Sequence, residues 1–175
     1  GTIIANFKSR TLIVLPLALL DQWHAQILKF TGHNSLVYHG ASKNDISTEE
    51  LIAAPIVLTT YGHCISDEIK KGQGKAGGEG ADEEEDRDDG GLLVGNEGRI
   101  LHRILWDRVV FDEAHHLRNQ RTRSHQGALS VRAPIRWLVT GTPIQNRKSD
   151  FFALCRVMGY ETKYFMDEDN LWDIA

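Results

Sequence analysis

The sequence has few cysteines and no long apolar segment. Only Cys64 and Cys155 occur among its 175 residues, far apart in the chain, which excludes a disulfide-stabilised scaffold and favours a reducing compartment. No stretch approaches the roughly 18 consecutive apolar residues of a membrane-spanning helix, so the sequence predicts no membrane partner. The start at Gly1, without Met and without a basic segment followed by an apolar run, indicates an internal or processed start rather than a signal peptide.

Charge is unevenly distributed along the chain. Residues 72–98 contain nine acidic residues against Lys75 and Arg87, a net charge of −7, so the overall charge of −4 leaves +3 on the remainder. The same range holds nine of the sixteen glycines. We predict a disordered insertion there, because so few apolar residues cannot offset the entropy lost on ordering. The alternative is an acidic docking or autoinhibitory loop that mimics DNA, and the basic remainder leaves a polyanionic partner open.

Apolar runs alternate with amphipathic segments in two blocks, roughly 9–70 and 99–160. Strands are expected at residues 10–15, 35–39, 56–60, 108–111 and 135–140, and helices at residues 20–31, 47–54, 121–131 and 149–158. This alternation predicts an α/β fold with a mainly parallel sheet flanked by helices. We expect Trp23 and Phe30 to lie in the core, with Gly32 ending their helix, and both cysteines to be buried.

Two adjacent carboxylates, Asp112 and Glu113, directly follow an apolar strand. Ligands of parallel α/β sheets bind at the carboxyl ends of strands. Such a pair suits a nucleotide site, where one carboxylate holds Mg²⁺ and the other positions or deprotonates the attacking water. The alternative is a solvated acidic pair that caps the next helix.

A polar cluster follows the next strand along the chain. The hydroxyls of Thr140 and Thr142 and the amides of Gln145 and Asn146 surround a turn at Gly141. Such a cluster can relay the state of a phosphate to a moving element. The alternative is an ordinary turn with capping residues.

The two motifs resemble those of the Swi/Snf-type branch of the superfamily-two helicase-like ATPases. Asp-Glu-Ala-His at residues 112–115 matches that family's Walker B box, and Thr-Gly-Thr-Pro-Ile-Gln-Asn at residues 140–146 matches its motif III. Residues 12–16 with 19–23 are similar to motif Ia, and residues 57–61 to motif Ib. Residues 101–110 look most like the subgroup that often carries an inserted RING finger, although no cysteine-rich RING occurs here. DEAH-box RNA helicases carry Ser-Ala-Thr at motif III, whereas this chain has Thr-Gly-Thr-Pro at residues 140–143, which argues against that family.

The resemblance implies a RecA-like lobe with ATP and Mg²⁺ as cofactors, double-stranded DNA or chromatin as partner, a second ATPase lobe and a nuclear location. It assigns Mg²⁺ ligation to Asp112, activation of water to Glu113 and coupling of nucleotide to DNA to His115. Coupling of nucleotide to DNA is also assigned to Thr140, Gly141, Thr142, Gln145 and Asn146. Contacts with DNA phosphates are assigned to Pro16, Thr59 and Thr60. Phosphate contacts read no bases, so no sequence specificity follows.

One part of the family's pattern is missing from the 175 residues. They contain no Gly-x-x-x-x-Gly-Lys-Ser/Thr loop, which supplies the amide cradle and the lysine for the phosphates. We therefore expect residues 1–160 to form a partial N-terminal lobe, residues 161–175 to begin a following segment, and the chain alone to be inactive. The alternative is a non-catalytic nucleic-acid-binding or interaction module that retains the fold.

Overall fold

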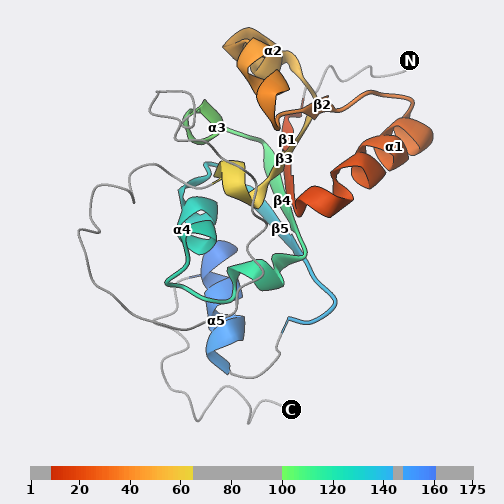
Figure 1. Cartoon of the computed structure of the whole chain (residues 1–175). Coiled ribbons are helices and arrows are strands. Elements are labelled where there is room, and N and C mark those ends of the chain that lie inside the picture. The colour runs from red at the N-terminus through yellow and green to blue at the C-terminus, as the bar shows by residue number, and fades with distance from the viewer. Residues whose placement is uncertain (1–8, 65–99, 144–147, 161–175) are drawn as a thin grey trace, which may run out of the picture.

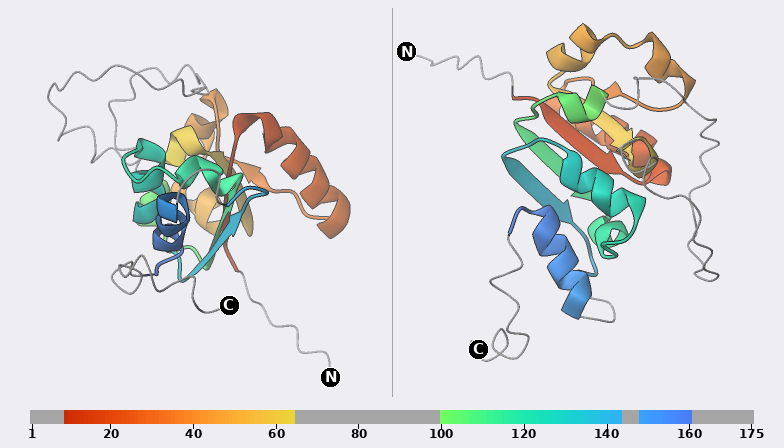
Figure 2. Two further views of the ribbon diagram at one scale, coloured as in Figure 1. Left: turned by 90° about the horizontal axis from the view of Figure 1, so that it is seen from below. Right: turned by 90° about the vertical axis from the view of Figure 1, so that its left-hand side faces the viewer.

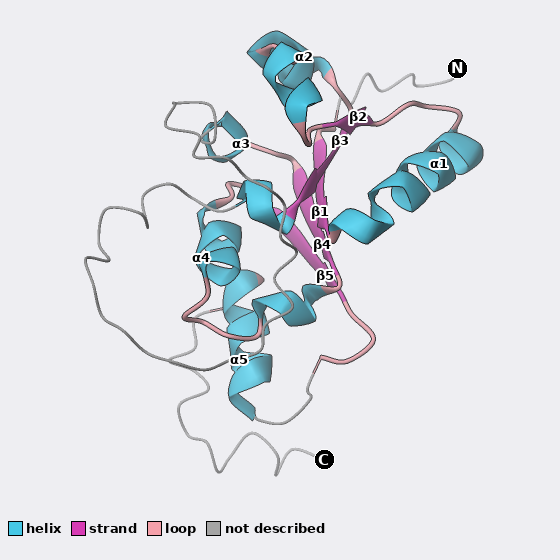
Figure 3. Cartoon of the chain, viewed as in Figure 1, coloured by secondary structure: helices cyan, strands magenta, loops and turns pink. Residues whose placement is uncertain are grey.

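The computed structural model describes residues 9–64, 100–143 and 148–160; the expected insertion at 72–98, the segment 161–175, Gln145 and Asn146 lie outside these ranges. A five-stranded sheet of order β2-β3-β1-β4-β5, parallel throughout, forms its centre (Figure 3). The strands are β1 (Thr11–Leu15), β2 (Leu36–Val37), β3 (Ile56–Thr60), β4 (Arg108–Asp112) and β5 (Ile135–Val139). The helices are α1 (Leu20–Thr31), α2 (Thr48–Ala53), α3 (Ile100–Arg103), α4 (Arg123–Ser130) and α5 (Lys148–Val157). The predicted α/β fold with a parallel sheet is confirmed.

Local signals in the sequence set the ends of two helices. Gly32 ends α1 in the left-handed conformation, with φ of 70°, and its N–H donates to the carbonyl of Leu28 at 2.9 Å. At the start of α2, the hydroxyl of Ser47 accepts from the N–H of Glu50, whose carboxylate accepts from the N–H of Ser47 in return. The short α3 was not expected from the sequence.

Helices cover both faces of the sheet. On β1, Leu12 and Val14 belong to the larger core, while Ile13 and Leu15 belong to a second cluster on the opposite face. Figure 1 shows α1 on one side of the strands and α4 and α5 on the other. The continuous apolar run of β1 therefore reflects burial on both faces, as expected for a parallel sheet.

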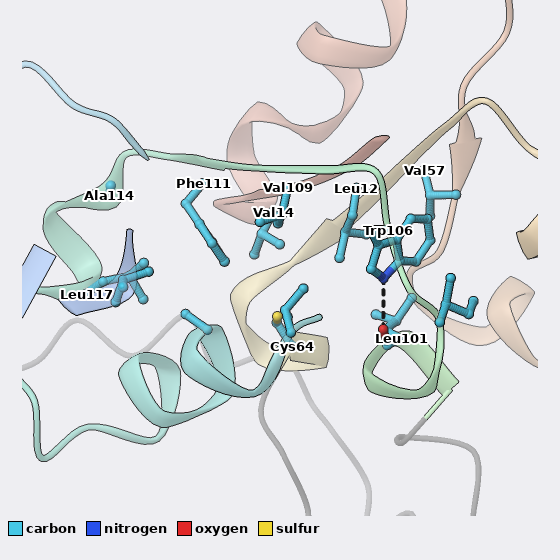
Figure 4. Packing of buried hydrophobic residues seen from close by; sticks show 14 of the residues in the cluster. Leu12, Val14, Val57, Cys64, Leu101, Trp106, Val109, Phe111, Ala114 and Leu117 are labelled. Atoms are coloured by element: carbon cyan, nitrogen blue, oxygen red, sulfur yellow. Dashed lines mark hydrogen bonds between the residues drawn. The ribbon is translucent and has the colours of Figure 1, made fainter. Parts of the chain in front are cut away.

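The larger core lies between the sheet and α3, α4 and α5 (Figure 4). Trp106 is completely buried there, and its indole N–H donates to the carbonyl of Leu101 at 2.8 Å. Cys64 and Cys155 are both buried, which confirms their expected place. Each fully buried large apolar side chain contributes about 1.5–3 kcal/mol to folding.

The expectation for Phe30 was wrong, because its side chain is 78% exposed. Figure 1 shows α1 diverging from the sheet toward its C-terminal end, and Ile27 is the last buried residue of the helix. Trp23 is half-buried and packs against the smaller cluster. Within the described ranges, no helix is both long and apolar enough to cross a membrane.

Candidate functional site

The candidate site lies where the connections of two neighbouring strands diverge. From β1 the chain passes to α1 on one face of the sheet, and from β4 it passes through the 3₁₀ helix Ala114–Leu117 to α4 on the opposite face (Figure 2). Ligands of open α/β sheets bind at the carboxyl ends of strands at such a switch point. Asp112, the last residue of β4, stands there.

Asp112 is held by three hydrogen bonds from different parts of the chain. Its Oδ2 accepts from the indole Nε1 of Trp23 at 2.7 Å, and its Oδ1 accepts from the backbone N–H of Glu113 at 2.9 Å. Its carbonyl oxygen accepts from the hydroxyl of Tyr61 at 2.7 Å. Both the carboxylate and the backbone of Asp112 are therefore fixed in orientation.

Glu113 adopts a backbone conformation that is rare for a residue with a side chain. Its φ of 49° and ψ of 47° lie in the left-handed region, which costs roughly 1–2 kcal/mol for an L-residue. This conformation turns the chain from β4 into the 3₁₀ helix within one residue. Strain of this kind concentrates at functional sites.

The carboxylate of Glu113 has its own neighbours. Its side chain is 43% exposed, and its Oε2 lies 3.1 Å from Nδ1 of His115, at an angle outside that of a hydrogen bond. The ring of His115 stacks on that of His116 at 4.4 Å, and His116 lies 5.4 Å from the ring of Tyr61. Burial raises the pKa of Tyr61 well above its ordinary value, and Cys64, Asp112 and Glu113 add to this rise, so the phenol keeps its proton as a donor.

The Asp112 carboxylate has the chemistry of a magnesium ligand. Mg²⁺ prefers oxygen donors and is commonly held by one or two carboxylates together with waters and phosphate oxygens. Each oxygen of Asp112 accepts one hydrogen bond in the structure and retains a further lone pair. The residues present therefore fit Mg²⁺ bound together with a nucleotide.

The motif III segment begins beside Asp112. Val139, the last residue of β5, pairs with Asp112, so Thr140 follows at the neighbouring strand end. The N–H of Thr142 donates to the Thr140 hydroxyl at 3.2 Å across Gly141. Both motifs therefore begin at the carboxyl ends of neighbouring strands. A shared role for their side chains stays a prediction.

Two of the three residues expected to contact DNA carry buried side chains. Thr59 is fully buried and its hydroxyl donates to the carbonyl of Tyr38 at 3.0 Å, while Thr60 is 5% exposed and its hydroxyl lies 3.0 Å from Nδ1 of His63. Pro16 is half-buried and precedes the 3₁₀ helix Leu17–Leu19. In this arrangement the buried Thr59 hydroxyl is not available to a phosphate, and the DNA contacts of all three residues stay predictions.

Trp23 and Tyr61 were not recognised as site residues from the sequence. Each belongs to a stretch matched to a family motif, but Trp23 was assigned to the core and Tyr61 was given no role. Their position in the chain could have identified them. Both residues lie within eight residues of the end of a strand, β1 or β3, that ends at the same sheet edge as β4.

Comparisons with known proteins agree with this geometry. A family model described as SNF2-related domain matches residues 3–168. DNA repair protein rad8 of Schizosaccharomyces pombe is 30% identical over 162 residues, covering 86% of this chain and 12% of the relative. DNA repair protein rad5 of Emericella nidulans is 34% identical over 160 residues, with 86% and 12% covered.

A solved structure, the Sulfolobus solfataricus SWI2/SNF2 ATPase core in complex with dsDNA, has a TM-score of 0.63 at 23% identity. The match covers 87% of this chain and 25% of that one. The chain spans between 10% and 14% of the length of the curated relatives it matches. Because the family model covers most of its residues and the fold matches, the chain belongs to the SNF2-related domain family of Swi/Snf-type helicase-like ATPases, with a RecA-like fold.

Proposed function

We propose that the chain forms part of one lobe of an ATP-dependent double-stranded DNA translocase with a role in repair or chromatin remodelling. The observation that carries this proposal is the fixed carboxylate of Asp112 at the switch point, with Glu113 beside it. Relatives named as DNA repair proteins, and a structural neighbour solved as an ATPase core in complex with dsDNA, support it. A nuclear location and membership of the RING-finger subgroup belong to the same proposal.

The residues would divide the work of phosphoryl transfer among them. ATP with Mg²⁺ supplies the γ-phosphoryl group and the charge that stabilises its transfer. Asp112 would hold the metal through its remaining lone pairs, and the exposed carboxylate of Glu113 would orient the attacking water and accept its proton. His115, beside Glu113, would couple this carboxylate to the DNA-contacting segments.

The motif III and DNA-binding residues complete the proposed cycle. Thr140, Gly141 and Thr142 begin beside Asp112, so they would respond to the nucleotide, together with Gln145 and Asn146. Pro16 and Thr60 lie at the same ends of β1 and β3, where backbone groups would meet phosphates of the duplex.

The test is phosphate release in the presence of double-stranded DNA. The 175-residue chain is expected to release none, because it lacks an amide cradle and loss of even one preorganised donor costs about 10²–10³ in rate. A longer polypeptide with a Gly-Lys-Thr loop before residue 1 and a second lobe after residue 175 is expected to show DNA-stimulated hydrolysis. Glu113→Gln should abolish that hydrolysis, whereas Glu49→Gln, on the exposed surface of α2, should leave it unchanged.

Two results would contradict this proposal. If the 175-residue chain releases phosphate in response to DNA, and Glu113→Gln abolishes this release, the expectation that the chain alone is inactive is refuted. Undiminished hydrolysis by the longer Glu113→Gln polypeptide would refute the role of Glu113.

The second candidate is a binding module without hydrolysis, which the missing phosphate loop favours. It predicts DNA binding by the chain that falls steeply with salt, as phosphate contacts do. A longer polypeptide that binds duplex DNA but hydrolyses no ATP would decide for this candidate.

A further inference from the structure

We propose that Trp23 is a positioning residue for the magnesium ligand Asp112, acting through the hydrogen bond from its indole N–H to the carboxylate. This inference rests on the proposed function, which makes Asp112 a ligand. Trp23 comes from the first turn of α1, on the face of the sheet opposite α4, and lies 89 residues before Asp112. Its side chain therefore crosses the switch point between β1 and β4.

The hydrogen bond is short and its donor is rigidly placed. The Nε1–Oδ2 distance of 2.7 Å is typical of a bond to a charged acceptor, which is about twice as strong as a neutral one. The indole has a single polar hydrogen, and its ring packs against the smaller apolar cluster, which includes Leu20 and Val110. Packing thus fixes the ring, and the ring fixes Oδ2.

Two N–H groups together determine the rotation of the carboxylate. The backbone N–H of Glu113 holds Oδ1 at 2.9 Å while Trp23 holds Oδ2, so rotation about the last side-chain bond of Asp112 would break both hydrogen bonds. The remaining lone pairs then point in fixed directions and would be available to a metal ion. Partners of this kind typically change metal affinity by about 10–100-fold when removed.

Tyr61 offers a useful contrast, because it bonds to the same residue at a different atom. Its hydroxyl donates to the carbonyl of Asp112 and fixes the main chain, whereas Trp23 fixes the carboxylate. The stretches matched to motifs Ia and Ib thus each touch Asp112 through one aromatic side chain. A shift of α1 against the sheet would reach the carboxylate of Asp112 through the hydrogen bond from Trp23.

The first experiment measures Mn²⁺ binding to the 175-residue chain by electron paramagnetic resonance of the free ion. Trp23→Phe keeps a ring in the same packing but removes the N–H, and it is expected to weaken Mn²⁺ binding about tenfold. Trp137→Phe is the matched control, since Trp137 is 55% exposed on β5 and, among the residues that the structure describes, has no hydrogen bond to the site. Asp112→Asn should remove the component of Mn²⁺ binding that Trp23→Phe weakens, whereas any Mn²⁺ held by the acidic residues of 72–98 should remain in every variant.

The second experiment tests whether the indole N–H of Trp23 lies beside the metal that Asp112 binds. In the chain with ¹⁵N-labelled tryptophan, the indole signal that Trp23→Phe deletes should be broadened by Mn²⁺. Asp112→Asn should abolish this broadening. Thermal unfolding of each variant is measured alongside, so that lost affinity is compared only among folded proteins.

The outcomes separate the inference from the function on which it rests. Wild-type affinity in a folded Trp23→Phe variant, or an unbroadened Trp23 signal in a chain that binds Mn²⁺ through Asp112, overturns the inference alone. Absent Mn²⁺ binding in the wild-type chain, or unchanged binding in Asp112→Asn, overturns the ligand role of Asp112 in the proposed function and the inference with it.

Discussion

Arg136 provides the sharpest stability prediction, because its guanidinium joins the ends of two helices to the sheet. From β5 its Nη1 donates to the carbonyls of Ala128 at 2.9 Å and Val157 at 3.2 Å. Its Nη2 donates to the carbonyls of Leu129, at 3.5 Å, and Val131. These acceptors belong to the last turn of α4 and to the end of α5, where carbonyls lack partners within the helix. A cation at that place also interacts favourably with both helix dipoles.

The magnitude follows from the number of helix ends that lose their donor. A hydrogen bond from a charged group contributes about 1.5–3 kcal/mol net, so one bond at each of two helix ends amounts to roughly 3–6 kcal/mol. Burial opposes this gain, since desolvation lowers the pKa of Arg136 and so penalises its charge. We therefore expect Arg136→Met to lower the free energy of unfolding by about 3 kcal/mol. Arg136→Lys should lose about half as much, because a compact ammonium cannot span both helix ends.

Urea unfolding followed by circular dichroism measures the effect. Arg132→Met, an exposed neighbour just before β5, is the control and should stay within about 0.5 kcal/mol of the wild type. A loss below about 1 kcal/mol in Arg136→Met would refute the reasoning, since it would mean that the freed carbonyls are satisfied by water at no cost.

Three further predictions concern buried or strained groups. Burial raises the pKa of Cys64 to about 12 and raises that of Cys155, so iodoacetamide at pH 8 should alkylate neither thiol until urea unfolds the chain; rapid native labelling would contradict this. Burial lowers the pKa of His125, which donates through Nδ1 to the carbonyl of Leu117. The contribution of His125 to the free energy of unfolding should therefore be fully present above pH 6.5, the pKa of the unfolded chain's histidine, and should fall as the pH drops below it. His125→Phe should flatten this fall in urea titrations between pH 7 and pH 5, and an equal slope in both proteins would count against it. Glu113→Gly should be about 1 kcal/mol more stable than Glu113→Ala, because only glycine adopts a φ of 49° without strain, and the reverse order would show that the strain is absent.

The strands and the strand-end motifs could be predicted from the sequence because both depend on local patterns. A run such as Leu12 to Leu15 has to be buried on both faces wherever it lies, and two such runs in an α/β chain form parallel neighbours. The helix ends at Gly32 and Ser47 likewise follow from backbone freedom and capping within a few residues. The placement of Asp112 beside Val139 also required that β4 and β5 be neighbours, as consecutive strands of such sheets often are.

Burial on individual helix faces could not be predicted in the same way. The spacing of Trp23, Ile27 and Phe30 indicates one apolar stripe, but α1 diverges from the sheet toward its last turn. Phe30 is exposed there, with the ammonium of Lys29 5.6 Å from its ring. Which residues of an apolar stripe are covered by the sheet depends on the strand lengths and on the direction of the helix. A local sequence pattern contains neither.

The contact between Trp23 and Asp112 was missed for a related reason that bears on how such sites are found. An aromatic residue in an amphipathic stripe is ordinarily explained by packing alone, and Trp23 does pack, so nothing in its spacing demanded a second role. Yet an indole has a polar hydrogen, and a half-buried one needs an acceptor. At a switch point the nearest strong acceptor is the carboxylate that ends the adjacent strand, which here is Asp112 at 2.7 Å. A tryptophan in the first turn of the helix after β1 is therefore a candidate partner for an acidic residue at the end of β4, and this reasoning needs only the strand order, not the side-chain coordinates.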